Sequence, residues 1–417
     1  MSGAGPRHVT VIGAGAVGMS AALYLQKDGH RVSVIDPRGA GRATSFGNAG
    51  AIVVGSCIPT SVPGLWRKVP GWLMDPAGPF RVRPAYLPRI APWLWRFLKA
   101  GRADRVEQIS IAMHQFTSRA GEPHRELAAL AGVSDLLRPV GWLKVYGGPD
   151  AAARTAFDRG ILSRRGVRFE VLDGDALRQL EPGIAPRYEH AVFQPDALFA
   201  AGPGELIAAY GRAFVERGGE IIQESVRRIE IGPEGPARLV TDLAIRPVEV
   251  LVLAAGAWSR PLAAQLGADV PLDTERGYHL KLSLEHGEGL RRPTAFVDEG
   301  FVLAPMNEGI RLTSGVELAG VEAPPDFRSI RAMLPKARAI LPGLGAEVSR
   351  EWLGFRPSLP DSMPVMGRSK RFRDVYFAFG HQHVGLSLGP VTGRVIADLV
   401  AGRDPGVDLS PFREDRF

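Results

Sequence analysis

The stretch Val9-Thr10-Val11-Ile12-Gly13-Ala14-Gly15-Ala16-Val17-Gly18 decides the fold of this 417-residue chain. Its first four residues form a short, branched apolar run that is typical of a buried parallel strand. Gly13, Gly15 and Gly18 then match G-x-G-x-x-G. In that motif the glycines permit a tight turn, the approach of a pyrophosphate to the backbone, and close packing of a helix on the strand. We expect the helix over residues 17–28, with Gly29 ending it.

A second strand is expected over residues 31–35, and it ends in Asp36. This acid follows the glycines by about twenty residues, where a carboxylate can accept hydrogen bonds from a ribose 2′-OH. An acid at this position disfavours a 2′-phosphate, so the motif predicts FAD or NAD rather than NADP. The residues of this unit that we expect to contact the dinucleotide are Gly13, Gly15, Ala16, Val17, Gly18, Asp36, Pro37 and Arg38.

Composition is that of a globular protein, with 45% hydrophobic and 23% charged residues and a length sufficient for two or three domains. Cys57 is the only cysteine, so the chain has no internal disulfide, and we expect no metal site. No run reaches 18 apolar residues, and the short polar start does not resemble a signal peptide. A cytoplasmic location is therefore expected.

Residues 59–105 differ from the rest of the chain. They hold four of the seven tryptophans (Trp66, Trp72, Trp93 and Trp95) and nine Lys or Arg against two Asp, a surplus equal to the whole net charge of +7. Trp beside cations suits a membrane headgroup layer. It also suits a cover over a substrate pocket with the tryptophans packed inward, which we favour because they lack one helical period. Nucleic-acid binding is not expected, since no recognition motif accompanies the segment.

Two more glycine-rich segments follow expected strands. Residues 41–50 form a small, polar loop whose backbone N–H groups can line a flat or phosphate-bearing ligand, although an ordinary surface loop is an equal alternative. After a strand at 248–253, small residues including Ala255 and Gly256 let the backbone pass close to a cofactor. Near the C-terminus, a strand at 375–379 leads into a glycine turn from Gly380 and a helix over residues 391–401. Such a helix N-terminus stabilises negative charge.

The middle of the chain is inserted between these elements. Short strands over residues 280–284, 294–297, 301–305 and 309–315 predict a second, largely antiparallel sheet. We expect a helix over 326–340 and a rigid, proline-spaced loop over 352–367 that contains one arginine, Arg356.

Six motifs in order now indicate a family. They are the N-terminal glycine motif, Thr44-Ser45-Phe46-Gly47-Asn48-Ala49-Gly50, Ala254-Ala255-Gly256-Ala257-Trp258-Ser259, Arg276-Gly277-Tyr278-His279, Gly354-Phe355-Arg356-Pro357 and the Gly380–Gly389 turn. The chain resembles, over essentially its whole length, the FAD-dependent D-amino-acid dehydrogenase branch of the D-amino-acid oxidase, glycine oxidase and sarcosine oxidase superfamily. The resemblance implies an α/β, Rossmann-like FAD-binding domain over 1–58, 203–275 and 351–417. It also implies an antiparallel-sheet, α+β substrate domain over 59–202 and 276–350, in a p-hydroxybenzoate-hydroxylase-like arrangement.

The resemblance also implies a site. Arg356 would grip a substrate carboxylate, and a planar guanidinium does so bidentately, as lysine cannot. Tyr278, His279 and His381 would lie near the substrate, although Tyr278 and His279 should not both face it because side chains alternate along a strand. His383 is unusual for D-alanine dehydrogenases and fits relatives acting on cyclic or N-substituted amino acids. The further implied FAD contacts are Thr44, Ser45, Asn48, Ala49, Gly50, Val226, Ala255, Gly256, Trp258, Gly380, His383, Val384, Gly385, Leu386 and Ser387.

The activity implied is transfer of a hydride from Cα of a small amino acid to flavin N5. The substrate would be a D-amino acid or a cyclic amino acid such as a hydroxyproline epimer. The electrons would pass to a quinone or another carrier, and a quinone would be met at a membrane surface, peripheral to the inner membrane. Cys57 lies far from the C-terminal motif in sequence, so the FAD is expected to be non-covalent. Alternatives are an O2-using oxidase, a flavoprotein subunit of a larger complex, and a nicotinamide-dependent dehydrogenase, against which the late glycine turn argues. The oligomeric state is not predicted.

Overall fold

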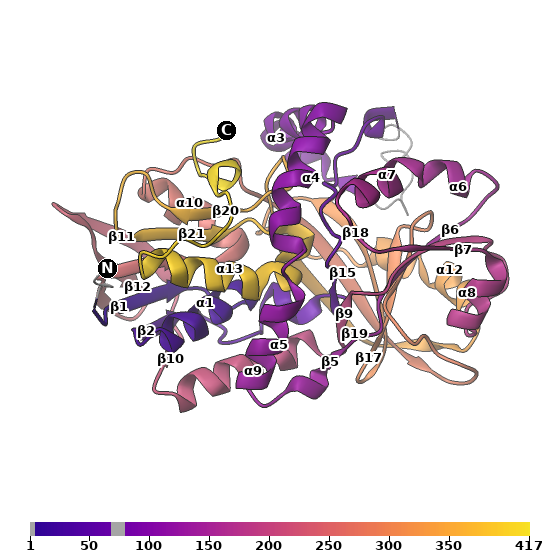
Figure 1. Ribbon diagram of the computed structural model, residues 1–417, viewed down its shortest axis with the longest axis horizontal. Helices are drawn as coiled ribbons and strands as arrows, with labels where there is room; N and C mark the ends of the chain where they lie inside the picture. Colours follow the sequence, from indigo (N-terminus) through magenta and orange to yellow (C-terminus); the bar gives the residue numbers. More distant parts are fainter. Residues whose placement is uncertain (1–4, 68–79) are drawn as a thin grey trace.

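The computed structural model describes residues 5–67 and 80–417. It contains two large sheets, and the first, the nucleotide-type sheet, lies on the left in Figure 1. It has six strands in the order β10-β2-β1-β14-β21-β20, parallel except for β20, which is antiparallel to β21. This order confirms the strands expected at both ends of the chain and at 248–253. The strands are β1 (His8–Ile12), β2 (Arg31–Ile35), β10 (Glu220–Ile222), β14 (Val250–Leu253), β20 (Val365–Arg368) and β21 (Val375–Phe379).

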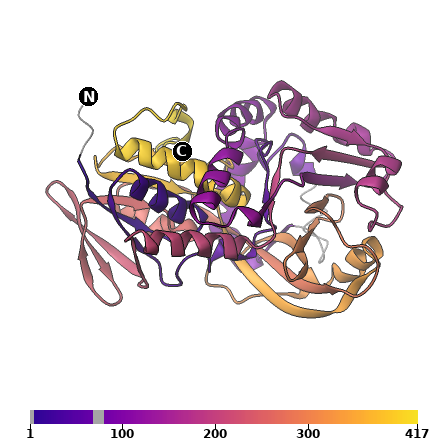
Figure 2. The same cartoon turned by 60° about the horizontal axis from the view of Figure 1, so that its bottom comes forward.

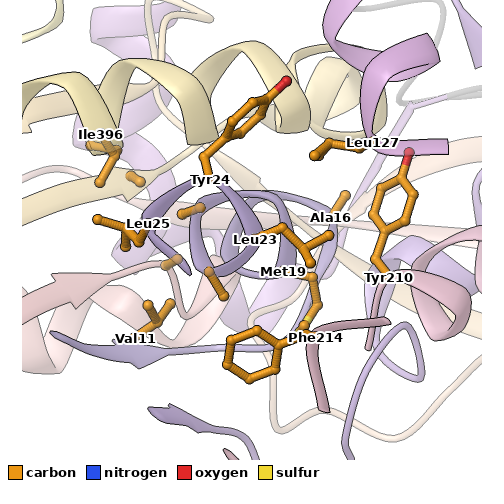
Figure 3. Packing of buried hydrophobic residues seen from close by; sticks show 14 of the residues in the cluster. Val11, Ala16, Met19, Leu23, Tyr24, Leu25, Leu127, Tyr210, Phe214 and Ile396 are labelled. Atoms are coloured by element: carbon orange, nitrogen blue, oxygen red, sulfur yellow. The ribbon is translucent and has the colours of Figure 1, made fainter. Parts of the chain in front are cut away.

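Helices α1 (Ala16–Lys27) and α13 (Gly385–Val400) pack closely on one face of this sheet. Figure 3 shows α1 with Val11 of β1 on one side and Ile396 of α13 on the other. A Cβ on Gly389 or Gly393 would lie 3.0 or 2.6 Å from backbone atoms of α1, so these glycines permit the close approach. The two helices run in the same direction, and their N-termini therefore lie side by side. Helices α5 (Gly121–Leu130) and α9 (Pro203–Glu216) complete this core.

The second sheet has nine strands and is mostly antiparallel, as expected, with the path β19-β15-β18-β17-β16-β6-β8-β7 and β4 added beside β18. Figure 2 shows its orange strands at the end of the molecule away from the N-terminus. Only the β6–β16 and β4–β18 pairs are parallel. The strands are β4 (Phe80–Val82), β6 (Trp142–Tyr146), β7 (Glu170–Leu172), β8 (His190–Gln194), β15 (Asp273–Leu284), β16 (Thr294–Phe296), β17 (Phe301–Met306), β18 (Gly309–Leu318) and β19 (Leu344–Ser358).

No helix within residues 5–67 and 80–417 is long and apolar enough to cross a membrane. Smaller elements surround the two large sheets. Two three-stranded sheets are formed by β11 (Val226–Gly232), β12 (Gly235–Thr241) and β13 (Ile245–Pro247), and by β3 (Ala51–Ile52), β9 (Leu198–Ala200) and β5 (Leu137–Arg138). The remaining α-helices described are α3 (Leu87–Ala100), α4 (Ala103–Thr117), α6 (Ala151–Arg154), α7 (Ala156–Arg164), α8 (Gly174–Leu180), α10 (Ser259–Gln265), α11 (Arg328–Arg331) and α12 (Leu334–Ile340).

The C-terminal helix begins at Gly385, six residues before the predicted start at 391. The prediction placed Pro390 before the helix, whereas Pro390 lies inside it. Proline has no N–H to bond the carbonyl four residues earlier, that of Leu386. Nε2 of His124 lies 2.9 Å from that carbonyl oxygen and supplies the missing contact. The first turn of α13 is therefore held from outside the helix.

Two other predicted elements differ from the structure. The first part of the expected loop at 352–367 is the end of β19, an edge strand, where Pro357 needs no ladder hydrogen bond on its outer side. The expected helix at 326–340 divides into α11 and α12, because Pro335 starts a new helix better than it continues one.

Strands β15 and β19 cross the domain boundaries expected at 275/276 and 350/351. They pair with each other along almost their whole length, from Asp273 opposite Ser358 to Leu284 opposite Leu344. A boundary inside either strand would divide one hydrogen-bonded ladder. We propose that both strands belong wholly to the substrate domain.

The expected inward packing of the tryptophan-rich segment is wrong for two of its three described tryptophans. Trp93 of α3 is buried and stacks on Phe97, with ring centroids 5.2 Å apart, but Trp66 and Trp95 are each 61% exposed. Helix α3 presents only one face to the sheet below it, which leaves Trp95 outside. Trp72, with Lys68 and Asp75, lies outside the described residues.

Candidate active site

A cavity of about 550 Å³ is lined by residues of both large sheets. Its nucleotide end is formed by the β1–α1 turn, the loop after β2, the end of β14 and the turn before α13. Its other end is lined by side chains of the second sheet. The chain thus builds one cavity from segments that are far apart in sequence.

The glycine motif has the close contacts that its sequence predicts. Gly13 has φ 110°, and a Cβ there would lie 2.4 Å from the carbonyl oxygen of Ala254. A Cβ on Gly18 would lie 1.9 Å from the carbonyl oxygen of Gly13, so Gly18 serves helix packing and does not line the cavity. The carboxylate of Asp36 accepts the N–H of Ala14 at 2.9 Å. It therefore fastens the turn as well as facing the cavity.

The loop over residues 44–50 is fixed between the two sheets, which rules out an ordinary surface loop. The Ser45 hydroxyl accepts a first-turn N–H of α1 at 3.0 Å. A Cβ on Gly47 would lie 1.9 Å from the Trp352 ring of β19. Arg311 of β18 donates to the carbonyl oxygen of Phe46 at 3.2 Å. The loop is thus held on both sides of the cavity.

These features fit a bound flavin dinucleotide. The N-termini of α1 and α13 both line the cavity, and each offers free N–H groups and a positive dipole end to an anionic group. The glycines of the first turn leave room for a diphosphate against the backbone. The lining residues of the second sheet give a flat ring system a surface to pack against.

Arg356 lies flat on that sheet, on a strip of glycines from three neighbouring strands. A Cβ on Gly277 would lie 2.3 Å from Nη2 of Arg356, and Nη1 donates to the carbonyl oxygen of Gly315 at 3.0 Å. Gly354 continues the strip on β19. Burial lowers the pKa of the Arg356 guanidinium, and the charge of Glu275 opposes that shift. The Arg356 side chain lines the cavity, and Glu275 is its partner on the neighbouring strand.

Glu275 is the cross-strand partner of Arg356 and is only 4% exposed. Its oxygens meet Nε2 of Gln382 at 2.7 Å and Nε2 of His383 at 2.6 Å. Burial raises the pKa of this carboxyl, but the His383 charge and the hydrogen bonds from His383 and Gln382 outweigh it, so the net shift is downward. Glu275 and Gln382 were not among the sequence predictions.

Most of the predicted site residues line this cavity. They are Gly13, Gly15, Ala16, Val17, Asp36, Thr44, Ser45, Asn48, Ala49, Ala255, Gly256, Trp258, Arg356, Gly380, His381, His383, Val384, Gly385, Leu386 and Ser387. The predicted contacts that do not line it are Gly18, Pro37, Arg38, Gly50, Val226, Tyr278 and His279. Arg38 instead lies over the Trp258 ring, 5.1 Å from its centroid, and Gly50 approaches the backbone of Ala200.

Tyr278 lies on the opposite face of the second sheet, which corrects the expectation that it lies near the substrate. Its hydroxyl donates to Glu317 at 2.6 Å, and burial, with that bond, raises its pKa to about 12. His279 is on the cavity face but is covered by the ring of Trp352, 4.9 Å away, and burial lowers its pKa to about 3.

His381 lines the cavity with its ring turned into the protein. Its Nε2 lies 3.1 Å from the Thr392 hydroxyl, and burial lowers its pKa to about 3. Cys57 is fully buried and does not line the cavity, and burial raises the pKa of its thiol to about 11. A neutral thiol away from the cavity agrees with non-covalent FAD.

Several residues that line the cavity were not among the predicted site residues. They include Trp142 and Lys144 of β6, Phe296 of β16, Val302 of β17 and Trp352 of β19. An available signal was Lys144, a charged residue inside the apolar run Trp142–Tyr146. The others follow from strand register, which alternation alone does not give.

Comparison with known proteins identifies the family. The model of the family described as FAD dependent oxidoreductase matches residues 8–399. The chain belongs to this family. FAD is therefore its cofactor, and the expectation of an FAD-dependent enzyme is confirmed.

Curated relatives in this family cover the whole chain. A D-amino-acid oxidase of Bradyrhizobium diazoefficiens is 36% identical, over 99% of each chain. A D-amino acid dehydrogenase of Agrobacterium fabrum is 28% identical, over 98% of this chain and 99% of the relative. Among solved structures, glycine oxidase from Geobacillus kaustophilus has a TM-score of 0.75 at 22% identity, over 99% of each chain. The last likeness confirms the fold, with its Rossmann-like and antiparallel parts.

Proposed function

We propose that this enzyme oxidises the Cα–N bond of a small amino acid, either a D-amino acid or a cyclic secondary one such as a proline epimer. When bound, FAD supplies the oxidant and accepts a hydride from Cα at N5. The observation that carries the proposal is the Arg356 guanidinium, which lies flat on the glycine strip inside the cofactor cavity. The names of the curated relatives support the same substrate class.

Arg356 fixes the orientation of the substrate. Two parallel N–H···O bonds fix the plane of the carboxylate, and rotation then remains only about the bond between the carboxylate carbon and Cα. The Cα–H bond can therefore be held toward the flavin position. The imine produced hydrolyses to a 2-oxo acid and ammonia, and a cyclic substrate gives a cyclic imine. The apolar neighbours Phe296 and Val302 limit the room for a side chain and exclude water.

A substrate panel tests this proposal. The purified holoprotein is mixed without oxygen with D- and L-amino acids, prolines and N-methyl amino acids, and the visible flavin absorbance is followed. We expect bleaching by at least one D- or cyclic amino acid. The absence of bleaching by every member of the panel contradicts the proposal.

The electron acceptor is proposed to be a quinone or another carrier, with O2 as the alternative. The relative named an oxidase favours the alternative, and those named dehydrogenases favour the first. Peroxide formation is measured against quinone or dye reduction with the substrate found above. Reduction of the quinone without equivalent peroxide supports a dehydrogenase, and equivalent peroxide in air supports an oxidase.

A peripheral membrane contact would bring a quinone close, and helix α3 supports it. Its outer side carries Leu87, Trp95 and Leu98, which are 49%, 61% and 37% exposed, beside cations such as Lys99. Lys99 lies 5.0 Å from the Trp95 ring centroid. Apolar side chains among cations suit an anionic lipid surface.

Vesicle co-sedimentation at low salt tests this contact. The protein should sediment with vesicles containing anionic lipid, and the Trp95→Ser variant should sediment less. Trp93→Phe, which changes the buried tryptophan of the same helix, is the control. Failure of the unchanged protein to sediment contradicts membrane docking.

A further inference from the structure

We propose that His383, held by Glu275, accepts the proton of the substrate amine. This inference rests on the proposed function, since it assigns a residue to the amine of an amino acid bound at Arg356. The family resemblance places three histidines, His279, His381 and His383, near the substrate or the FAD. Of these three, the geometry points to His383.

The first observation is the position of the pair. Nε2 of His383 lies 2.6 Å from one oxygen of Glu275, and Glu275 pairs across the strands with Arg356. In an amino acid the amine is attached to the carbon next to the carboxylate. An amine whose carboxylate is held on Arg356 can therefore reach the Glu275–His383 pair beside that arginine, and His383 lines the same cavity as Arg356.

The second observation is backbone strain around the pair. Within residues 5–67 and 80–417, the non-glycine residues with positive φ are Gln382, at 46°, and Ser362, at 63°. Nε2 of Gln382 donates to Glu275 at 2.7 Å and to the Thr60 hydroxyl at 3.2 Å. The Thr60 and Ser362 hydroxyls lie 3.0 Å apart. Both strained residues thus belong to one network that ends on Glu275, and such strain gathers at active sites.

The third observation is that His279 and His381 are unsuited to accept the proton of the substrate amine. His279 is 1% exposed beneath Trp352, and Nε2 of His381 is engaged with Thr392. Burial lowers the pKa of both to about 3, so neither holds a proton readily. The His383 side chain is 38% exposed and has a carboxylate partner.

The proton transfer follows from this arrangement. With Nε2–H donating to Glu275, Nδ1 carries a lone pair and can accept a proton from the substrate ammonium. One N–H bond of the substrate breaks, one Nδ1–H bond forms, and the positive charge moves to an imidazolium stabilised by Glu275. The neutral amine then forms the C=N bond as the hydride leaves Cα with its electron pair for FAD. The organic product of these two steps is an iminium ion.

The Glu275 carboxylate of β15 is in contact with this imidazole, whereas Gln382 and Thr60, which extend the same network, are neutral. Glu275 therefore stabilises an imidazolium formed at His383, and Glu275→Gln removes that stabilisation.

The pH dependence of the anaerobic flavin-bleaching rate tests the proposal. In His383→Gln the rate at neutral pH should fall by roughly 10²–10⁴-fold, the range of general-base catalysis, and recover at high pH, where solvent deprotonates the amine. Glu275→Gln should also lower the rate at neutral pH, because the imidazolium loses its carboxylate partner. His286→Gln, at an exposed histidine, is the matched control.

Ligand binding gives a readout that does not depend on turnover. Benzoate offers a carboxylate alone, and 2-aminobenzoate adds a neighbouring amine; both are titrated by the change in the visible flavin spectrum. The ratio of their affinities should fall by roughly 3–10-fold in His383→Gln, the factor of one hydrogen bond, with benzoate affinity unchanged. If that variant does not load FAD, His383→Ala with added imidazole replaces it, and restoration of its rate by imidazole is expected.

A wild-type rate and pH profile in His383→Gln, with an unchanged affinity ratio, overturns the inference and leaves the proposed function intact. Absence of imidazole rescue in His383→Ala also counts against it. If no amino acid bleaches the unchanged protein, the proposed function and this inference fail together.

Discussion

The two faces of strand β15, in the middle of Figure 1, use similar residues for different purposes. On the cavity face, Glu275 and Gly277 lie beneath the Arg356 guanidinium. On the back face, Arg276 is 0% exposed and faces Glu317 at 3.3 Å. Each face therefore brings an arginine of the sheet close to a carboxylate, but of Arg356 and Arg276 only Arg356 lines the cavity.

The back face is a closed ion cluster. Glu317, 4% exposed, also accepts hydrogen bonds from Arg83 at 2.8 Å and from the Tyr278 hydroxyl at 2.6 Å. Arg276 and Arg83 both donate to the carbonyl oxygen of Pro324. Since Arg83 directly follows β4, the cluster joins the start of the α3 segment to the second sheet.

The difference between the faces lies in how the carboxylate is shared. Glu317 is taken up by two arginines and a hydroxyl of the protein, and Arg276 itself is 0% exposed and does not line the cavity. Glu275 is taken up by Gln382 and His383, so the nearby Arg356 keeps donors for a carboxylate from outside. A buried arginine marks a binding site only when its protein partner is engaged elsewhere.

The largest effect that separates the faces is expected for Arg276→Gln. Removing the fully buried cation of this cluster leaves Glu317 with Arg83 as its remaining cationic partner, which should cost up to about 3–5 kcal/mol of unfolding free energy, the cost of a broken buried pair. Denaturant unfolding of the holoprotein measures it. Arg356→Gln, on the open face, is the matched variant and should lose much less; equal losses would remove the distinction.

The next effect is expected for Gly277→Ala. The new Cβ would lie 2.3 Å from Nη2 of Arg356, so the guanidinium must move off the glycine strip. A displacement of about 1 Å can lower a reaction rate roughly 100-fold. We expect the affinity for benzoate, measured by a flavin spectral titration, to fall by a similar factor. Gly160→Ala in α7, where the nearest atom is 3.4 Å away at the end of Arg164, is the control. Unchanged affinity would show that the strip does not position Arg356.

The smallest effect is expected for Tyr278→Phe, which should cost about 1–3 kcal/mol of stability through the lost bond to Glu317. The folded-state pKa of Tyr278 is raised to about 12 from the ordinary value near 10. The contribution of the Tyr278 hydroxyl to the free energy of unfolding is therefore complete below pH 10 and is lost as the pH rises toward 12. The stability difference between wild type and variant, followed by denaturant unfolding across that range, should shrink. A larger KM in the variant would indicate instead that Tyr278 acts on substrate binding.

The nucleotide end of the site was predictable because it is made of contiguous turns. Gly13, Gly15 and Asp36 lie in one βαβ unit whose spacing alone fixes their geometry. The Gly380 turn was found in the same way, although the start of α13 was misplaced because sequence does not reveal that His124 supports the turn around Pro390.

The substrate end depends on register between distant strands. The opposition of Glu275 and Arg356 arises only when β15 pairs with β19, and sequence predicted a loop at that place. Alternation correctly separated Tyr278 from His279, but which of them faces the cavity is decided by how the whole sheet packs. The positive φ of Gln382 had no sequence signal, since it is imposed by its contacts with Glu275 and Thr60.

The central claim is that Arg356 receives the substrate carboxylate. Benzoate binding to the Arg356→Gln holoprotein, measured by the flavin spectrum, tests it most directly, with Arg331→Gln on the exposed side of α11 as control. We predict a loss of about 2–5 kcal/mol, roughly 30-fold or more in Kd, with FAD retained and with the control unchanged. Equal affinities of the Arg356→Gln and unchanged proteins for benzoate would contradict the account.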